Sequence, residues 1–281
     1  MLDNLKDYNI ILASNSPRRR ELLAGLGLDF EVRTIDGIDE SYPRHLALTE
    51  VARYIACQKA QAYRNTLKRD ELLITADTVV IAGSEILGKP TDADDAARML
   101  RLLSGCTHQV VTGVCLVTAQ NHRIFSVSTD VTFKRLSKEE IHYYIDHYRP
   151  FDKAGAYGIQ EWIGYIGVTA IRGSYYNVMG LPIQRIYKEL LHFKKPGQIE
   201  SRDERWNRIY EEVREHMDQY HRLPSKHHAE DFRMLNWLKY NRKCLAAGTM
   251  TDERKALFMQ LQQEAEAYQR VNQYGYAGEK K

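Results

Sequence analysis

Short apolar runs alternate with helix-like segments from the beginning of the chain to about Leu191. Apolar runs of about four to eight residues are typical of buried strands, and apolar residues spaced three and four apart are typical of helices packed on a sheet. Strands that alternate with helices favour an α/β fold, a sheet layered with helices. The predicted strands span residues 9–13, 30–33, 72–76, 79–81, 109–117 and 124–133, and the predicted helices span 17–26, 48–63, 93–103 and 138–148.

The alternation ends at the segment Lys194-Lys195-Pro196-Gly197. Beyond it the sequence predicts no strand, but it predicts three helices at residues 205–220, 230–242 and 252–270, separated by breaker residues. A length of 281 residues fits two domains of ordinary size. We therefore expect an α/β domain at residues 1–196 and a small all-helical domain at residues 200–281.

The composition is that of a globular protein, with 43% hydrophobic and 27% charged residues. A net charge of +3 is too small for a protein that coats polyanions, although it leaves room for a local basic patch. No apolar run reaches the roughly 18 residues of a membrane-spanning helix, and the first residues lack the pattern of a secretory signal. The four cysteines fit no Cys-x-x-Cys or zinc spacing, so we expect reduced thiols and a cytoplasmic protein.

The first candidate site lies where the first strand meets the first helix. Ser16 is a favourable N-cap and Pro17 a favourable first helical residue, so the helix should begin there. The free N–H groups of a helix N-terminus attract anions, and Ser14 and the arginines from Arg18 to Arg20 add donors for phosphate oxygens. A capped helix with a solvated basic face is the alternative interpretation.

The second candidate is Asp77, which follows an apolar strand in Ala76-Asp77-Thr78. A carboxylate among apolar residues is costly unless it is paired, hydrogen-bonded or bound to a metal, so Asp77 is a candidate metal ligand or general base. An Asp that caps a turn is the alternative. Lys89 lies on a predicted turn suited to phosphate or to solvent, and Glu40 and Lys59 have no distinguishing local pattern.

The third candidate is the segment from Asp152 to Gln160, which contains two glycines among small and aromatic residues. Glycine permits close approach of the backbone to a ligand, although a structural turn would use it equally well. The amide of Gln160 offers both a donor and an acceptor, as recognition of a base edge requires.

Together these segments resemble the Maf family, whose members are nucleoside triphosphate pyrophosphatases once described as septum-formation inhibitors. The resemblance covers residues 8–191, with the motifs in family order. It implies an α/β fold of the inosine triphosphatase-like type, with a long cleft across a mixed sheet. The matching segments are Ser14-x-Ser16-Pro17-Arg18-Arg19-x-Glu21-Leu22-Leu23, Ala76-Asp77-Thr78-Val79-Val80, Gly88-Lys89-Pro90, Lys153-Ala154-Gly155-Ala156-Tyr157-Gly158-Ile159-Gln160 and Asn177-Val178-x-Gly180-Leu181-Pro182.

The resemblance also implies the roles of single residues in the hydrolysis of a nucleoside triphosphate to the monophosphate and pyrophosphate. Asp77 would accept the proton of the attacking water and, with Glu40, would hold a divalent cation, Mg²⁺ or Mn²⁺. Both ions suit carboxylate oxygens. The residues that would contact the triphosphate are Ser14, Arg18, Lys59 and Lys89.

Arg18, Thr78 and Gln160 match the specificity set of the branch of the family that acts on dTTP and UTP. The branch that favours 7-methyl-GTP differs at the positions of Thr78 and Gln160. The resemblance therefore implies dTTP and UTP as substrates, with modified pyrimidine nucleotides as further candidates.

The C-terminal segment resembles helicase-associated domains, which are small three-helix modules. We expect Trp206 and Trp237 to lie in its core, with base stacking as the alternative. Nucleic acid is a candidate partner of this segment, because basic residues outnumber acidic ones between residues 222 and 243, although a solvated helix face explains the same pattern. The basic residues are Arg222, Lys226, Arg233, Lys239, Arg242 and Lys243.

Two functions of different classes follow from the sequence. The first is a cytoplasmic dTTP/UTP pyrophosphatase with a helical accessory domain, with or without assembly into a homodimer. The alternative is a nucleotide-sensing regulatory protein of cell division, whose helical domain binds nucleic acid or a protein partner. Neither function requires a membrane.

Overall fold

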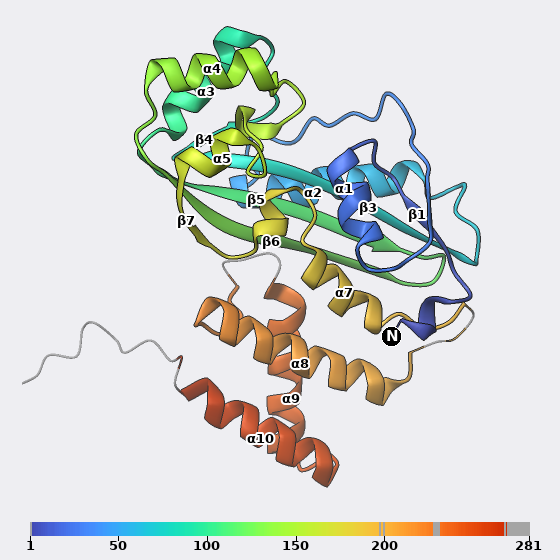
Figure 1. Ribbon diagram of the computed structural model, residues 1–281. Coiled ribbons are helices and arrows are strands. Elements are labelled where there is room, and N and C mark those ends of the chain that lie inside the picture. The colour runs from blue at the N-terminus through green and yellow to red at the C-terminus, as the bar shows by residue number, and fades with distance from the viewer. Residues whose placement is uncertain (1, 197, 199, 227–230, 267, 269–281) are drawn as a thin grey trace, which may run out of the picture. The chain divides into compact units, whose positions relative to one another are not determined.

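The computed structural model describes residues 2–196, 198, 200–226, 231–266 and 268 of the chain (Figure 1). The chain divides into two compact units, Met1–Ile199 and Glu200–Lys281. Each unit has an apolar core formed by its own residues.

The first unit is built on a mixed sheet of seven strands in the order β2-β1-β3-β5-β6-β7, with β4 also paired to β3. Strand β1 runs parallel to its neighbours β2 and β3, and the other pairs are antiparallel. The strands are β1 (Asn9–Leu12), β2 (Phe30–Val32), β3 (Glu71–Ala82), β4 (Glu85–Leu87), β5 (Thr107–Val117), β6 (His122–Phe133) and β7 (Val168–Arg172).

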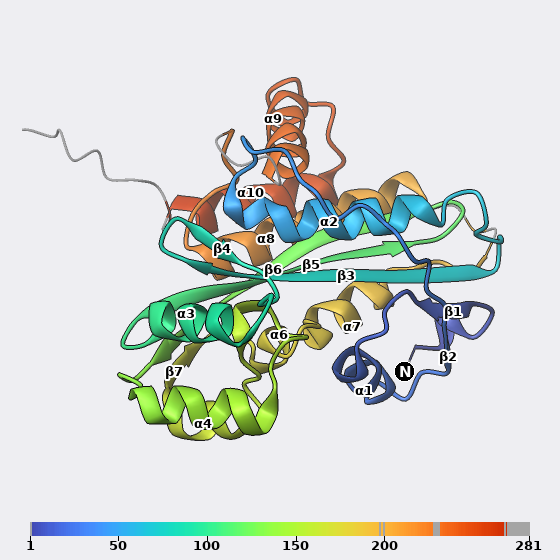
Figure 2. The same cartoon turned by 90° about the horizontal axis from the view of Figure 1, so that it is seen from above.

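Helices cover both faces of this sheet (Figure 2). Helix α2 (Leu48–Ala62) lies on one face, where it packs on β3 and β5. The opposite face carries the helices α1 (Pro17–Ala24), α3 (Ala93–Leu103), α4 (Lys138–Tyr148) and α7 (Ile183–Leu191). Two further helices are short, α5 (Trp162–Gly167) and α6 (Tyr175–Val178), and single 3₁₀ turns occur at Asp3–Leu5 and Ala154–Ala156.

Strand β3 contributes side chains to both helical layers because successive side chains of a strand point to opposite faces. Leu73 and Val79 pack with residues of α2. Ile74 and Ala76 belong to the core beneath α1 and α7, and Val80 belongs to the core beneath α3 and α4. By the same alternation Asp77 points to the α2 face and Thr78 to the opposite face.

One edge of β3 changes its pairing partner along its length. Strand β1 pairs with residues from Glu71 to Ile74, and β4 pairs with residues from Val80 to Ala82. Between these two stretches neither strand accompanies β3, so the sheet is split beside Asp77. The other edge is paired continuously with β5, from Leu73 to Ile81.

The mixed α/β architecture predicted from the sequence is confirmed, and most predicted elements are present. The two strands predicted at residues 72–76 and 79–81 form one strand, and the alternative of a turn at Asp77 is wrong. Continuous pairing with β5 keeps the backbone extended through this carboxylate. Strands β4 and β7 were not predicted; β4 has only three residues and most residues of β7 are exposed, so neither has a clear apolar pattern.

The predicted starts of α1 and α4 are confirmed by side-chain caps. The Ser16 hydroxyl accepts a hydrogen bond from the backbone N–H of Arg19, and Pro17 is the first residue of α1. At α4 the Ser137 hydroxyl accepts from the Glu140 N–H, and the Glu140 side chain accepts from the Ser137 N–H. This reciprocal pair satisfies two of the backbone donors that a helix leaves free at its start.

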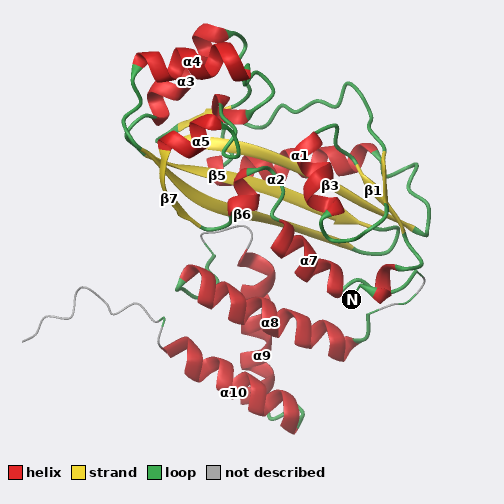
Figure 3. Ribbon diagram, viewed as in Figure 1, coloured by secondary structure: helices red, strands yellow, loops and turns green. Residues whose placement is uncertain are grey.

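The second unit contains α8 (Arg202–Tyr220), α9 (Phe232–Ala246) and α10 (Asp252–Glu266), which are among the helices drawn in red in Figure 3. The predicted core positions of Trp206 and Trp237 are confirmed, since both are buried with Phe258 and Leu261. The buried Asn241 joins them: its side-chain oxygen accepts from the Trp206 indole at 2.6 Å, and its amide donates to the Trp237 carbonyl at 2.8 Å.

The three helices of the second unit differ from the predicted ranges mainly at their ends. Helix α8 begins earlier than predicted, at Arg202, because Ser201 and Glu204 form a capping box. Helix α9 extends to Ala246, beyond the predicted end at residue 242. Residues 230, 267, 269 and 270 of the predicted helices lie outside the described part of the chain.

Candidate active site

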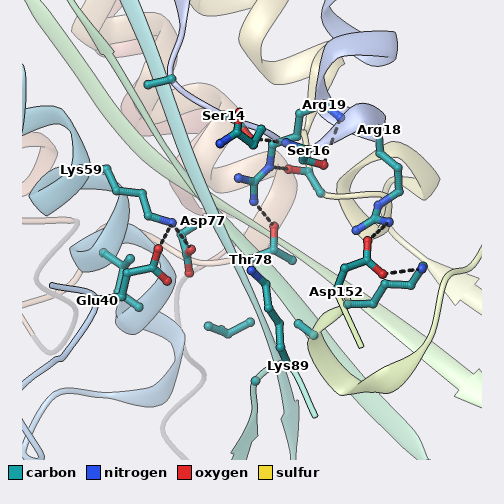
Figure 4. Close-up of a pocket in the computed structure, with 18 of the residues that line it drawn as sticks. Ser14, Ser16, Arg18, Arg19, Glu40, Lys59, Asp77, Thr78, Lys89 and Asp152 are labelled. Atoms are coloured by element: carbon teal, nitrogen blue, oxygen red, sulfur yellow. Dashed lines mark hydrogen bonds and ion pairs between the residues drawn. The ribbon is translucent and has the colours of Figure 1, made fainter. Parts of the chain in front are cut away.

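A cavity of about 770 Å³ lies beside the split in the sheet. Its lining comes from segments far apart in the sequence: the β1–α1 junction, the loop between β2 and α2, helix α2, strand β3, the turn after β4, and residues 152–160 and 178–180. Every candidate site residue lines it, namely Ser14, Arg18, Glu40, Lys59, Asp77, Thr78, Lys89 and Gln160. Figure 4 shows most of them as sticks.

The N-terminus of α1 opens into this cavity. Strand β1 ends at Leu12, and the chain then turns so that Ser14 and Ser16 precede the first helical turn. The buried Ser14 hydroxyl accepts a hydrogen bond from the Ser16 N–H at 3.2 Å. Hydroxyls and backbone N–H groups at a helix start are suited to an anionic ligand.

On the α2 face of the sheet, Lys59 lies between two carboxylates (Figure 4). Its Nζ is 2.7 Å from Asp77 Oδ1 and 2.9 Å from Glu40 Oε1. Burial raises the pKa of Asp77 above its ordinary value, and the positive charges of Lys59 and Arg19 oppose that shift. A carboxyl whose pKa is raised in this way is a candidate proton acceptor.

On the opposite face, Arg19 hydrogen-bonds the Thr78 hydroxyl and a backbone carbonyl in the part of β3 where β1 and β4 do not pair with it. Its guanidinium donates to the carbonyl of Ala76 at 2.7 Å and to that of Gly180 at 2.8 Å. A third bond, of 3.1 Å, reaches the Thr78 hydroxyl, which also bonds the Thr112 hydroxyl at 2.9 Å. Arg19 therefore provides a donor to Ala76 where no neighbouring strand lies beside it.

Arg18 points to the other end of the cavity, where it pairs with Asp152 at 3.1 Å (Figure 4). Asp152 is also paired with Lys153 at 2.6 Å, and Lys153 is 3.1 Å from Glu161. Burial acts to raise the pKa of Asp152, but the positive charges of Lys153 and Arg18 hold it below its ordinary value. The network fixes the loop that carries Gln160, whose Oε1 is buried without a hydrogen-bond partner in the described structure.

Sequence patterns did not assign roles to Asp152 and Lys153. They counted Arg19 among the donors for phosphate oxygens, but its guanidinium donates to two backbone carbonyls and to the Thr78 hydroxyl instead. Lys153 is part of a matching motif and Asp152 precedes it, but the Arg18–Asp152 contact joins residues separated by 134 positions. Arg19 stands in the first motif beside two similar arginines, and only its contacts distinguish it from them. In the sequence, the position of Arg19 shortly after a strand end is the one feature that could have indicated its contacts with the strand edge.

The donor set near Asp77 fits a hard divalent cation. The carboxylates of Asp77 and Glu40 lie close together, and the ammonium of Lys59 contacts both of them. The region between these carboxylates therefore favours positive charge. Mg²⁺ is commonly held by one or two carboxylates together with water and substrate phosphates. In the described part of the chain no group of three or more His, Cys, Asp or Glu side chains is placed to hold a metal. A cation here would therefore depend on the ligand for the rest of its coordination.

The fold and the site together define a class: an α/β protein whose split sheet borders a cavity at a helix N-terminus, lined by basic, acidic and hydroxyl side chains. The Maf-like protein family model matches residues 9–193, and the chain belongs to the Maf family. Residues from 200 onward lie outside that match, so the resemblance of this segment to helicase-associated domains stays a prediction.

Relatives of known name are similar to the first unit. A dTTP/UTP pyrophosphatase from Phocaeicola vulgatus is 63% identical over 190 residues, which are 68% of this chain and 98% of the relative. A dTTP/UTP pyrophosphatase from Parabacteroides distasonis is 59% identical over 193 residues, 69% of this chain and 100% of the relative. These relatives thus correspond in length to the first unit alone.

Among solved structures, a HAM1 protein from Coxiella burnetii is similar with a TM-score of 0.36 and 15% identity. The match covers 66% of this chain and 100% of that protein. Similarity of this degree carries no argument about the fold, so the assignment to the mixed α/β class depends on the observed strand order and pairing.

Proposed function

We infer that this chain is a nucleoside triphosphate pyrophosphatase that hydrolyses dTTP and UTP to the monophosphate and pyrophosphate. Membership of the Maf family and identities of 63% and 59% to dTTP/UTP pyrophosphatases support the activity. The observation that carries it is that candidate residues from separate segments all line one cavity. A cavity that offers basic and hydroxyl side chains beside a largely buried carboxylate suits hydrolysis of a phosphoanhydride.

The triphosphate is proposed to lie between the start of α1 and the end of α2. Ser14 and the backbone N–H of Arg18 at the start of α1 would donate to phosphate oxygens. The side chains of Arg18, Lys59 and Lys89 would balance the phosphate charge. Cleavage between the α and β phosphates builds negative charge on the pyrophosphate leaving group. Cations fixed in place before the reaction stabilise that charge most where water is excluded.

Asp77 is the proposed proton acceptor for the attacking water. Its side chain is 13% exposed and lies within the sheet, and burial raises its pKa, so the carboxylate is a better base than one in water. Continuous pairing of β3 with β5 holds it at a fixed position. Glu40 and Asp77 would hold a divalent cation, Mg²⁺ or Mn²⁺. When bound, such a cation supplies charge neutralisation for the phosphate oxygens.

The nucleobase of the substrate is proposed to bind on the opposite side of the sheet from Asp77, where Thr78 and Gln160 line the cavity. The Gln160 amide has a buried oxygen without a partner in the described structure, and a base edge with an N–H donor would satisfy it. Arg18, tied to Asp152, lies at the same end and retains further N–H donors. These three residues form the proposed specificity set for dTTP and UTP, and modified pyrimidine nucleotides remain further candidates.

Release of pyrophosphate from a panel of nucleotides tests this function. With Mg²⁺ present we expect dTTP and UTP to be hydrolysed well ahead of 7-methyl-GTP and dGTP. Asp77→Asn should lower kcat by about 10²-fold or more, since general acid–base groups contribute about that much. Asp36→Asn, which alters another carboxylate of the cavity lining, should change kcat far less. Failure of both dTTP and UTP to yield pyrophosphate would reject the activity.

Other expectations from the sequence remain predictions. None of the helices in the described part of the chain is both long and apolar enough to span a bilayer. A cytoplasmic location, a homodimer and nucleic-acid binding by the second unit are predictions of this kind. Two of the six basic residues that make nucleic acid a candidate partner are engaged within that unit, Arg222 with Asp231 and Arg233 with Glu212.

A further inference from the structure

The ammonium group of Lys59 lies beside both carboxylates that are proposed to hold the divalent cation. Its Nζ is 2.7 Å from Asp77 Oδ1 and 2.9 Å from Glu40 Oε1, so one positive charge bridges the pair (Figure 4). The side chains of Lys59 and Asp77 are only 16% and 13% exposed, whereas that of Glu40 is 55% exposed. Partly buried contacts of this kind are screened less by salt than contacts on an open surface.

A divalent cation and the Lys59 ammonium draw on the same two carboxylates. Oxygens that face an ammonium at hydrogen-bond distance have to be released, at least in part, before they coordinate a metal ion. Two positive ions a few ångströms apart also repel each other, and the repulsion is strong where water is largely excluded. With one oxygen of each carboxylate held by the ammonium, the pair is a weaker ligand for a second cation in the arrangement that the structure shows.

We propose that Lys59 is an internal substitute for the divalent cation: it neutralises Glu40 and Asp77 in the ligand-free protein, and the arriving cation displaces its ammonium toward the triphosphate. This inference rests on the proposed function and assigns Lys59 a role in the order of binding. Metal alone binds weakly, because it competes with the ammonium for both carboxylates and is repelled by its charge. Metal and nucleotide together bind strongly, because the phosphates give the ammonium a new partner and give the cation further ligands.

The placement of Lys59 makes such a displacement feasible. Its backbone belongs to α2, which is anchored on the sheet by buried residues such as Ala52 and Ala56, so the movement is confined to the flexible side chain. The ammonium faces a cavity of about 770 Å³ that is also lined by Ser14 and Lys89. A rotation of the side chain carries the charge toward the proposed phosphate position without moving the helix.

Binding of Mn²⁺ to the full-length protein without nucleotide tests the proposal, with free Mn²⁺ measured by electron paramagnetic resonance. We expect Lys59→Met to bind Mn²⁺ about tenfold or more tightly than the unaltered protein, because no ammonium competes for the carboxylates. Lys89→Met is the matched control. It removes the same charge from the same cavity, and the described structure shows Lys89 in no ion pair with Glu40 or Asp77. We expect its Mn²⁺ affinity to change by less than about threefold.

A second measurement tests the coupling to nucleotide. A dTTP analogue with a non-hydrolysable link between the α and β phosphates should tighten Mn²⁺ binding by the unaltered protein more than binding by Lys59→Met. Adding Asp77→Asn to Lys59→Met should abolish the tight binding, which identifies the site. Circular dichroism checks that each variant is folded. If Lys59→Met does not fold, Lys59→Gln, which keeps a polar end group without the charge, replaces it in the measurement.

Two results would overturn the proposal. Equal Mn²⁺ affinity of the unaltered protein and of both Lys59 variants would show that the ammonium does not compete with the cation. Equal tightening by Lys59→Met and Lys89→Met would show a general effect of charge in the cavity. Because these measurements need no turnover, they are separate from the test of the proposed function, which fails only when neither dTTP nor UTP yields pyrophosphate.

Discussion

At the scale of single residues, three consecutive arginines in α1 have three different environments. Arg18 lines the cavity and pairs with Asp152, whereas Arg19 donates to two backbone carbonyls and to a hydroxyl in the interior. Arg20 is exposed and bonds the side chain of Asn15 at 3.3 Å. Successive residues of a helix point about 100° apart, so adjacent identical side chains reach different surroundings. We expect Arg18 to contact the ligand and Arg19 to stabilise the fold, whereas Arg20 is exposed to solvent.

Replacing Arg19 should therefore affect stability more than replacing its neighbour. Arg19→Met leaves the carbonyls of Ala76 and Gly180 without this donor, and we expect a loss of about 2 kcal/mol in the free energy of unfolding. Arg20→Met removes one exposed bond and should cost no more than about 0.5 kcal/mol. Urea unfolding of both variants measures the difference. Equal losses would contradict the assignment of Arg19 to the fold.

His108 on β5 is a buried titratable group outside the site. Its side chain is 3% exposed, its Nε2 is 2.8 Å from the Tyr157 hydroxyl, and burial lowers its pKa to about 4. The unfolded chain binds a proton at this histidine near pH 6.5, whereas the folded chain does so only near pH 4. Its contribution is therefore fully present above about pH 6.5 and is lost as the pH falls toward 4.

Between pH 7.5 and pH 5 we expect His108 to account for about 2 kcal/mol of the stability that the first unit loses. In His108→Gln this part of the pH dependence should be absent, whatever the stability of the variant at neutral pH. His122→Gln, a change at an exposed histidine on β6, should keep the full dependence. Urea unfolding at the two pH values measures it. The same pH dependence in all three proteins would show that His108 titrates normally.

At the scale of elements, the distance between α2 and the sheet sets the position of Lys59. Gly113 on β5 lies opposite Asp77 on β3, directly beneath α2. A Cβ at Gly113 would lie 2.3 Å from the backbone nitrogen of Arg53, too close for any side chain. The glycine thus allows the helix backbone to contact the strand, and this contact brings the Lys59 ammonium within hydrogen-bond distance of Asp77.

Gly113→Ala should therefore weaken both the fold and the site. The added methyl group has to push α2 away from the sheet, and we expect a loss of about 1–3 kcal/mol in the free energy of unfolding. Turnover of dTTP should fall as well, beyond what the unfolded fraction explains, because Lys59 moves with the helix. Gly88→Ala is the stability control, since a Cβ there meets nothing within 4 Å. An alanine tolerated at 113 without either loss would contradict this account.

Element prediction from the sequence succeeded where the signal is local. The capping residues Ser16 and Ser137 are three positions from the N–H groups they bond, so the starts of α1 and α4 were predictable. The sequence did not reveal that β3 continues through Asp77, because that strand is stabilised by β5, some 30 residues later. Pairing with a distant strand keeps a carboxylate inside a strand, where its own local preference indicates a turn.

At the scale of the whole molecule, the chain joins a unit that matches the Maf family model to a second, helical unit that lies outside the match. The core of the first unit and that of the second contain different residues, and the relative from Parabacteroides distasonis matches over its full length within 193 residues. A domain that buries its own apolar core can fold alone. The first unit is therefore expected to be a complete enzyme.

A chain that ends at residue 199 should fold and retain dTTP hydrolysis, with kcat/KM within about threefold of that of the full chain. Steady-state kinetics of the two proteins at equal folded fraction measures this. The separately expressed residues 200–281 should show helical circular dichroism, which Asn241→Ala should weaken, because Asn241 bonds both core tryptophans. A large loss of kcat/KM in the shortened chain would show that the helical unit contributes to catalysis.

The sequence by itself determined the α/β class, the change of character near residue 197, the start of α1 and the candidate residues that line one cavity. All of these depend on patterns within a few residues or on short motifs, which can be recognised without knowing the tertiary structure. The tertiary structure decided the uninterrupted strand through Asp77, the separate environments of three arginines and the bridge between Glu40, Lys59 and Asp77. These features join distant segments, as in the Arg18–Asp152 pair across 134 positions, and only folding brings such side chains within reach of one another.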